Sequence, residues 1–385
     1  MSSGGQAGAG SAAAGEAPTT GHGGEGGVAA EGGVGAEGGV AGTSAAGAEQ
    51  GGEPSEPEPV RPNRVFVTSQ SYVLADLGGL PGADAACAER AEAANLPGTF
   101  VAWLSSSTVN ARDRLGSANG WINVRGNPFA DRAAELLDAL QVYYPIVFDE
   151  TGERVTSRIA TGTQPDGTVA PHNCEDYTSK VGTVVVVTGN ATGGSAVWTA
   201  DEENSCNQAY RIYCFEVSRN ASLYPTPSQG RTVFVSSEPF VLGNQGRTAA
   251  DAQCAEDAAA ADLSGTFVAL LPTATESALA RLSQPSRPWV RPDGAMVAGA
   301  TSSVSNAPLA SAITERADGK HVGGVPLFGA EDITQKAVLH CEDWKNPNAA
   351  VSVVIHGVAG YTDARWYAAV TAACSDPAHV LCVEQ

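Results

Sequence analysis

The chain has 385 residues, with 42 acidic and 22 basic side chains and a formal net charge of −20. That length accommodates two or three domains. The acidity argues against nucleic-acid binding, which needs a basic surface, and no uninterrupted apolar run is long enough to span a membrane. We expect the negative charge mainly to keep the protein soluble.

Residues 1–62 form an acidic arm rich in Gly, Ala and Glu, in which a Glu-Gly-Gly-Val unit recurs every six residues from Glu25. This composition cannot bury enough apolar surface to offset the entropy of ordering the backbone, so it predicts a disordered tether. The residues after Met1 have neither a basic segment nor an apolar core and do not resemble a signal peptide. We expect an export leader upstream of Met1, such as one ending in a lipidated cysteine.

The next segment, residues 63–217, shows mixed helix and strand signals, which predict an α+β domain. Residues 83–94 are rich in Ala and are followed by Pro97-Gly98, which predicts a helix and its end. The run Gly-Thr-Val-Val-Val-Val-Thr over residues 182–188 is β-branched and predicts a strand. Further expected elements are strands at 65–68, 100–104 and 211–215 and a short helix at 108–115.

A linker with three breakers, Pro225, Pro227 and Gly230, covers residues 218–230, and residues 231–385 then repeat the preceding segment. Val65-Phe-Val returns as Val233-Phe-Val, and Gly98-Thr-Phe-Val-Ala returns from Gly265. A period this long indicates tandem domains rather than a solenoid of short repeats. The expected elements of the second copy are helices at 248–261 and 275–282 and strands at 233–236, 267–271 and 351–355.

Eight cysteines follow the same duplication. The gaps between successive cysteines are 87, 32 and 8 residues in the first copy and 87, 33 and 8 in the second. Matching gaps in two copies predict a shared disulfide framework and therefore an oxidising compartment. The alternative is a cytoplasmic protein with eight reduced thiols. The cysteines are Cys87, Cys174, Cys206 and Cys214, then Cys254, Cys341, Cys374 and Cys382.

Four cysteines in each copy allow three pairings. We favour the nested one, because Cys87 lies in the expected helix and Cys214 in the last strand, so that their bond joins the two ends of the domain. Cys174 then pairs with Cys206, and by symmetry the second copy has Cys254–Cys382 and Cys341–Cys374. The outer loop would contribute ~4–5 kcal/mol through chain entropy. A bond between Cys206 and Cys214, which closes only a short loop, stays open as the rival.

Several segments of the first copy together resemble a known family. They are Arg64-Val-Phe-Val-Thr-Ser, Leu77-Gly-Gly-Leu-Pro-Gly-Ala-Asp, Gly98-Thr-Phe-Val-Ala-Trp-Leu-Ser, Trp198-Thr-Ala and Tyr213-Cys-Phe-Glu. They resemble the C-type-lectin-like fold and, more closely, the endostatin-like domain of bacterial surface lipoproteins, the leptospiral endostatin-like group. The resemblance implies two tandem C-type-lectin-like domains, each with two helices, a small mostly antiparallel sheet, long loops and two nested disulfides.

The resemblance implies recognition or adhesion, because members of this group are implicated in binding host matrix and serum proteins. We expect a non-catalytic module, outside the cell or tethered to its surface, that holds an extracellular protein or glycan in the loops at 116–172 and 283–338. The second copy has Leu242-Gly-Asn-Gln-Gly in place of Leu-Gly-Gly-Leu-Pro-Gly, so the implied function transfers less directly to it. A structural spacer is a further alternative.

Calcium-dependent lectins of this fold bind Ca²⁺ and sugar hydroxyls through a triplet such as Gln-Pro-Asp, which occurs here at Gln164-Pro165-Asp166. A calcium site needs six to eight oxygen ligands. The resemblance implies Gln164, Asp166, Glu175 and Asp201 as candidates, although Trp-Asn-Asp, usual in these lectins, is replaced by Trp198-Thr-Ala. The competing interpretation is an ordinary turn, which Pro-Asp-Gly also favours. If the triplet is an ordinary turn rather than a calcium site, we expect no bound metal and no cofactor.

Four further side chains are candidate ligand contacts. Trp121 and Trp289 lie in the loop regions, where an exposed indole could stack on a sugar or anchor a partner, although packing on the core is the commoner role. Asn173 and Glu175 flank Cys174. The histidines beside Cys174 and Cys341 do not predict zinc or a nucleophile, because both need a free thiolate. No catalytic motif is present, and we expect no catalytic residue.

Overall fold

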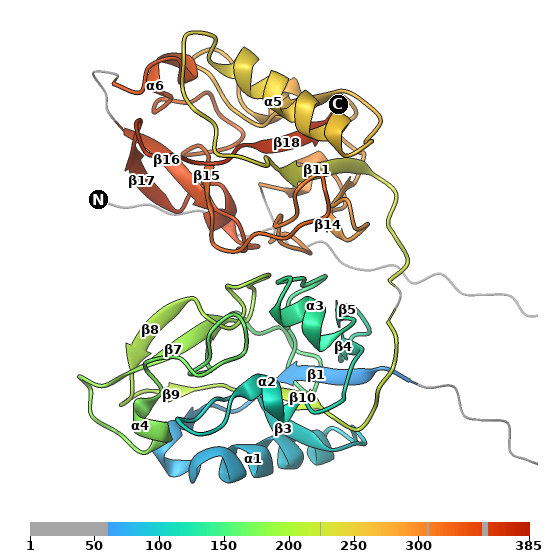
Figure 1. The fold of residues 1–385 in the computed structure, drawn as a ribbon, viewed down its shortest axis with the longest axis vertical. Helices are drawn as coiled ribbons and strands as arrows, with labels where there is room; N and C mark the ends of the chain where they lie inside the picture. Colours follow the sequence, from blue (N-terminus) through green and yellow to red (C-terminus); the bar gives the residue numbers. More distant parts are fainter. Residues whose placement is uncertain (1–60, 224, 306–307, 349–352) are drawn as a thin grey trace, which may run out of the picture. The chain divides into compact units, whose positions relative to one another are not determined.

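The computed structural model describes residues 61–223, 225–305, 308–348 and 353–385. Residues 1–60 of the acidic arm, for which we expect disorder, lie outside the described residues. The described residues belong to one compact unit, which contains two structural repeats that we define as residues 63–217 and 231–385 (Figure 1). The α+β class is confirmed, and the C-type-lectin-like assignment stays a prediction.

A five-stranded sheet lies at the centre of the first repeat, and β1 is its middle strand. β1 pairs antiparallel with β10, where Val65 opposes Phe215, and parallel with β4. Val65, Phe66 and Val67 are all completely buried, because the sheet is covered on both faces. In sheet order the strands are β3 (Phe100–Ala102), β10 (Tyr213–Glu216), β1 (Asn63–Val67), β4 (Trp121–Asn123) and β5 (Pro128–Ala130).

A smaller antiparallel sheet and several short elements complete this repeat. The smaller sheet has the order β6-β7-β8, and β2 pairs with β9. The strands are β6 (Arg158–Ala160), β7 (Val185–Asn190), β8 (Glu202–Ser205), β2 (Tyr72–Val73) and β9 (Ala209–Tyr210). The helical elements are η1 (Leu74–Asp76), α1 (Gly79–Ala93), α2 (Ala111–Arg114), α3 (Ala133–Leu137) and α4 (Cys174–Tyr177).

The second repeat has the same topology, with a five-stranded and a three-stranded sheet. The strands of the first are β12 (Phe267–Ala269), β18 (Leu381–Glu384), β11 (Arg231–Val235), β13 (Trp289–Val290) and β14 (Met296–Ala298). Those of the second are β15 (Pro326–Phe328), β16 (Val353–Val358) and β17 (Val370–Ala373). The helical elements are α5 (Arg247–Ala260), η2 (Leu279–Arg281), η3 (Thr301–Ser303), α6 (Cys341–Trp344) and η4 (Ala364–Trp366).

The helix expected at 275–282 is wrong in extent, because only the 3₁₀ turn η2 forms there. Thr273 Oγ1 accepts a hydrogen bond from the backbone of Glu276, and Ser277 Oγ accepts one from Ala280. Such local side-chain bonds offer the backbone an alternative to a regular helix. In the first repeat the corresponding helix, α2, forms only over Ala111–Arg114, which is shorter than the expected 108–115.

Successive side chains of β1 point to opposite faces of the main sheet, so the first repeat has one apolar cluster on each face. β11 divides the second repeat in the same way. Phe66 points to the face that α1 covers, and Val65 and Val67 point to the opposite face. The first of these faces contains the buried, small residues of α1, which let the helix approach the sheet closely. The opposite face is aromatic and contains Trp103, Trp121, Phe129, Trp198 and Phe215.

Both disulfides of each repeat are nested, as favoured from the cysteine spacing. Cys87 on α1 bonds to Cys214 on β10, and Cys174 on α4 bonds to Cys206. The second repeat has Cys254–Cys382 and Cys341–Cys374. The outer bond therefore joins the long helix to the main sheet, and the inner bond joins the short turn α4 or α6 to the end of the smaller sheet.

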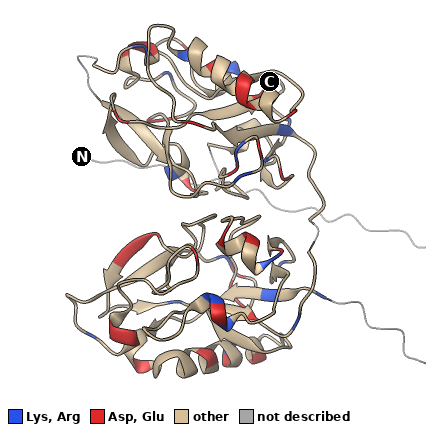
Figure 2. Cartoon of the chain, in the orientation of Figure 1, with Lys and Arg blue, Asp and Glu red and all other residues tan. Residues whose placement is uncertain are grey.

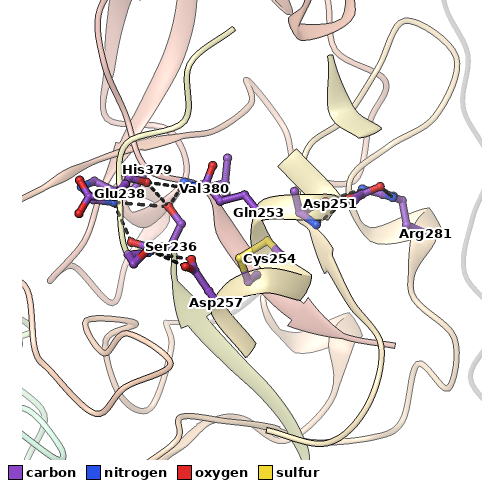
Figure 3. The surroundings of a disulfide bond; sticks show 12 residues. Ser236, Glu238, Asp251, Gln253, Cys254, Asp257, Arg281, His379 and Val380 are labelled. Carbon is purple, nitrogen blue, oxygen red and sulfur yellow. Dashed lines mark hydrogen bonds and ion pairs between the residues drawn. A yellow bond between two sulfur atoms is a disulfide. The ribbon is translucent and has the colours of Figure 1, made fainter. Parts of the chain in front are cut away.

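An ion pair repeats beside each outer disulfide. Asp251 on α5 accepts a hydrogen bond from the backbone of Ala269 at 2.9 Å and from Arg281 Nη2 at 2.7 Å (Figure 3). Asp84 and Arg114 make the same contacts in the first repeat. The carboxylate thus fastens helix to strand. Figure 2 shows further acidic residues along both long helices, of which Glu89, Glu92 and Glu256 are exposed.

The two loops expected to hold a ligand also contact one another. The carbonyl oxygen of Val142, within the loop at 116–172, accepts a hydrogen bond of 2.9 Å from Arg291, within the loop at 283–338. Part of each loop is therefore engaged between the repeats, and ligand binding by the remainder of the two loops stays a prediction. Further hydrogen bonds join Tyr143 to Ser311, Tyr144 to Met296, Thr192 to Thr362 and Gly194 to Gly360. Among the described residues no helix has the length and apolar character needed to cross a membrane.

Candidate functional site

The triplet Gln164-Pro165-Asp166 forms a hydrogen-bonded turn. Asp166 Oδ1 accepts hydrogen bonds from the backbone N–H and the hydroxyl of Thr168, at 2.9 and 2.6 Å. These bonds hold the pKa of Asp166 below its usual value. In the second repeat Asp332 accepts the same two bonds from Thr334, at 2.8 and 2.6 Å. The second repeat forms the same turn although it lacks the Gln-Pro-Asp triplet. The hydrogen bonds of the turn therefore explain the position of the aspartate side chain without a bound cation.

The four residues expected to bind calcium are not gathered at one point. Gln164 and Asp201 line one pocket of about 270 Å³, together with Glu202 and Glu203. Asp166 is engaged in its own turn, and Glu175 is exposed on α4. In the described part of the chain the carboxylates of Asp166, Glu175 and Asp201 do not come within 4.8 Å of one another as a group. The three carboxylates therefore do not form one cluster among the described residues, and the calcium site stays an alternative.

Asn173 and Glu175 belong to an unusual left-handed turn. All four residues of α4, from Cys174 to Tyr177, have φ between +55° and +61°. Asn173 caps this turn, because its Oδ1 accepts a hydrogen bond of 3.0 Å from the backbone of Asp176. Asn173 therefore has a structural role here, whereas the side chain of Glu175 faces solvent.

A left-handed conformation costs ~1–2 kcal/mol for each residue with a Cβ, so the surroundings must hold this turn in place. Cys174 is bonded to Cys206, and the buried Tyr177 hydroxyl donates to the carbonyl oxygens of Ser105 and Thr161, at 2.7 and 2.9 Å. α6 repeats the turn from Cys341 to Trp344, with φ from +49° to +66°. The turn is thus a duplicated part of the scaffold.

Trp121 and Trp289 lie in the core, which corrects their expected role in ligand stacking. Neither side chain has any exposed surface. The indole N–H of Trp121 donates to the carbonyl oxygen of Glu216 at 3.0 Å, and that of Trp289 donates to Thr301 Oγ1 at 3.0 Å. Strands β4 and β13 begin at these residues, and a strand adjacent to the central one directs large side chains inward.

A serine and a histidine also lie close together in the second repeat (Figure 3). His379 Nδ1 is 2.8 Å from the carbonyl oxygen of Ser236 and 3.4 Å from its hydroxyl. The hydroxyl donates to the carbonyl oxygen of Glu238 at 2.8 Å. Thr68 and Arg211 make the corresponding contacts in the first repeat. The pair joins two strand ends and has no arrangement for activating a nucleophile.

A polar groove of about 540 Å³ lies beside the β6-β7-β8 sheet. Its lining consists of hydroxyl, amide, guanidinium and carboxylate groups, which can donate and accept hydrogen bonds. The side chain of Gln208 is exposed within it. The polar groove is lined by Thr156, Ser157, Arg158, Asn190, Asn204, Gln208, Ala209 and Tyr210 of the first repeat and by Asp363 and Arg365 of the second.

Each guanidinium group of the polar groove faces a carboxylate. Arg158 Nε lies 2.5 Å from Glu202, and Arg365 Nη2 lies 2.7 Å from Asp363. The Arg158 hydrogen bond holds the pKa of Glu202 below its usual value. Because each positive charge is paired, the groove offers hydrogen bonds rather than net charge, which suits a neutral polar ligand better than a strongly charged one.

Asp201 joins the two repeats at the edge of the polar groove. It is largely buried, accepts a hydrogen bond from the Tyr361 hydroxyl and lies 3.9 Å from Arg365 Nη1. Burial raises the pKa of Asp201, although these partners and Asn190 oppose the shift. Arg365 also covers the ring of Tyr361, 3.8 Å from its centroid. The aspartate is thus committed to the contact between the repeats.

A second set of ionisable groups, which we call the buried ionic cluster, consists of Arg291, Asp293, Glu315 and His321. Arg291 lies 3.8 Å from Glu315 and forms a shorter ion pair with Asp293. Burial, reinforced by Asp293, raises the pKa of Glu315 to about 8. Burial and Arg291 lower the pKa of His321 to about 4.

A scan against protein-family models finds no match to this chain, and neither does a search of curated proteins.

The groove residues Arg158, Asn204, Gln208 and Arg365 were not predicted from the sequence. Arg158, Asn204 and Gln208 lie in or beside short strands, where a polar side chain predicts only a solvent-facing position, and Arg365 lies in the 3₁₀ turn η4. The groove forms when β6, β8 and η4 with its N-cap Asp363 come together, and those segments are far apart in the sequence. No local motif marks them.

Proposed function

We propose that the protein is a non-catalytic recognition or adhesion module, outside the cell or on its surface, and that it binds a protein or glycan ligand. The observation that carries this proposal is the polar groove, which has the volume and the hydrogen-bonding groups to hold a segment of such a ligand. The four disulfides are consistent with an extracellular location. The C-type-lectin-like and endostatin-like resemblance supports the same role.

The paired charges narrow the chemistry of the ligand. A strongly anionic ligand would meet Glu202 and Asp363, and a strongly cationic one would meet Arg158 and Arg365. A neutral oligosaccharide or an uncharged peptide segment avoids both conflicts and can use the amide groups of Asn204 and Gln208. We propose calcium-independent binding, because Asp166 and Asp201 are engaged in other hydrogen bonds and Glu175 lies on a separate turn.

Binding to an array of glycans and matrix proteins, measured with calcium and with EDTA, tests this proposal. The expected result is a ligand whose signal persists in EDTA and falls at least tenfold in the double variant Arg158→Ala/Gln208→Ala. Both side chains are exposed in the groove, so the fold should survive the change.

Arg132→Ala/Gln335→Ala is a matched control, because it removes an exposed Arg and an exposed Gln from outside the polar groove. This variant should bind as the wild type does. Equal binding by both double variants would place the ligand elsewhere. A binding signal that both EDTA and Asp166→Ala abolish would instead support the calcium-dependent lectin. If the protein binds nothing on the array, the structural spacer would be the favoured alternative.

A further inference from the structure

The buried ionic cluster brings three metal-ligating side chains to one point in the second repeat. Oxygen atoms of Asp293 and Glu315 and a ring nitrogen of His321 all lie within 4.8 Å of one another. Asp293 comes from the turn between β13 and β14. Glu315 and His321 face each other across a short antiparallel bridge. Two hairpins of the scaffold therefore fix the three donors.

The charges in the buried ionic cluster do not balance. Arg291 supplies one positive charge, and its nearest partner is Asp293. Glu315 is almost completely buried, with its Oε2 accepting a hydrogen bond of 2.9 Å from the backbone of Asp293. With both carboxylates ionised and His321 neutral, one negative charge is left without compensation. A buried charge of this kind requires a counter-charge or a proton.

His321 supplies a second, independent observation. Both of its ring nitrogens are shielded from solvent, and neither has a hydrogen-bond partner among the described residues. A buried polar atom without a partner costs ~1–3 kcal/mol. The imidazole lies beside the two carboxylates, where a bound cation would give one nitrogen its missing partner.

The first repeat shows that the fold does not need this cluster. The bridge between Glu315 and His321 corresponds to the bridge between Phe148 and Arg154. The position of Asp293 corresponds to Arg125, whose guanidinium lies 5.6 Å from the centroid of the Phe148 ring. The same hairpins are thus held by a cation–aromatic contact in one repeat and by an ionisable cluster in the other.

We propose that Asp293, Glu315 and His321 bind one divalent transition-metal ion, with Zn²⁺ as the test ion. A site of two carboxylates and one imidazole suits Zn²⁺ and its neighbours, because the nitrogen ligand disfavours Ca²⁺ and Mg²⁺, which prefer oxygen. Three protein ligands leave a further coordination position for water. Arg291 remains paired with Asp293 and limits the charge of the occupied site.

Isothermal titration of chelator-treated full-length protein with Zn²⁺ tests the site, and Co²⁺ absorption reports its coordination. We expect one ion per chain, a rise in the melting temperature on adding Zn²⁺, and a visible Co²⁺ band. Glu315→Gln and His321→Ala should each lower the Zn²⁺ affinity at least tenfold. Glu315→Gln keeps the shape of the side chain, so it remains informative if His321→Ala fails to fold.

His172→Ala is the matched control, because His172 is an exposed histidine 3.5 Å from Glu203 in the first repeat. It should leave the Zn²⁺ affinity unchanged. A loss of binding in His172→Ala, with normal binding in Glu315→Gln, would overturn the proposal in favour of adventitious surface binding. No Zn²⁺ uptake by the wild type would overturn it as well and would leave a proton to neutralise the cluster. Neither result bears on the polar groove.

Discussion

Removing the two disulfides of one repeat separately should cost unequal amounts of stability. The outer bond, Cys87–Cys214, spans 127 residues, and the inner bond, Cys174–Cys206, spans 32. Chain entropy assigns about 4.9 kcal/mol to the outer loop and about 3.7 kcal/mol to the inner one. The expected difference is therefore about 1.2 kcal/mol, with the outer bond contributing more.

The four cysteines are equally buried, so replacing each pair by alanine removes similar packing and the comparison isolates the loop term. The left-handed turn acts in the same direction. Without Cys174–Cys206, α4 is free to relax toward ordinary backbone angles, which recovers part of the loss in the inner variant. We therefore expect Cys87→Ala/Cys214→Ala to melt about 2–5 °C below Cys174→Ala/Cys206→Ala.

Thermal denaturation followed by circular dichroism measures this difference, and the second repeat replicates it. There the separations are 128 and 33 residues, so the ranking should be the same. Equal melting temperatures in both repeats, or a lower one for the inner variant, would refute the reasoning. Such a result would show that strain or residual structure in the unfolded chain outweighs loop length.

Three further predictions concern single side chains. Asp84→Ala and Asp251→Ala should each cost ~1–3 kcal/mol in chemical denaturation, because each carboxylate fastens a helix to a strand; the exposed Asp138→Ala should cost far less. Asp166→Ala and Asp332→Ala should each lower the free energy of unfolding by ~1 kcal/mol, and the loss should be the same in calcium and in EDTA. A calcium-dependent loss that occurs only in Asp166→Ala would contradict the assignment of this triplet to a turn. Burial lowers the pKa of His356 and of His379, so each imidazole contributes a loss of stability as the pH drops below about 6.5. Glu315, whose pKa burial raises to about 8, contributes in the opposite direction, so the imidazole contribution is the difference between the wild type and a histidine variant. Denaturation at pH 7.5 and 5.5 measures this loss, and His356→Gln should reduce it; an unchanged pH dependence would remove His356 as a cause.

The scaffold could be predicted from the sequence because its signals are local or covalent. The Ala-rich run around Cys87 and the short apolar run from Val65 predict α1 and β1, although α1 begins at Gly79, four residues before the expected start. Pro81 falls in its first turn, where a missing N–H costs little. The spacing of the cysteines limits the disulfides to a few pairings, and the structure has the favoured one.

The candidate site could not be predicted in the same way. Trp121 looks like a loop residue because β4 is only three residues long, too short to show an alternating pattern. Arg365 reaches the polar groove because contacts between the repeats, among them the hydrogen bond from Tyr361 to Asp201, hold the second repeat against the first. A contact between residues 160 positions apart leaves no periodic or spacing signal in a single sequence.

The duplication separates what the fold requires from what it permits. The nested disulfides, the helix-to-strand carboxylates and the left-handed turns occur twice, so these features belong to the scaffold. The cluster around Glu315 occurs once, and the equivalent hairpin in the first repeat carries Phe148 and Arg154. Because both versions support the same topology, the scaffold leaves these positions free to acquire a function. A specific role for the second repeat is therefore to be sought at the buried ionic cluster rather than at the turns that both repeats share.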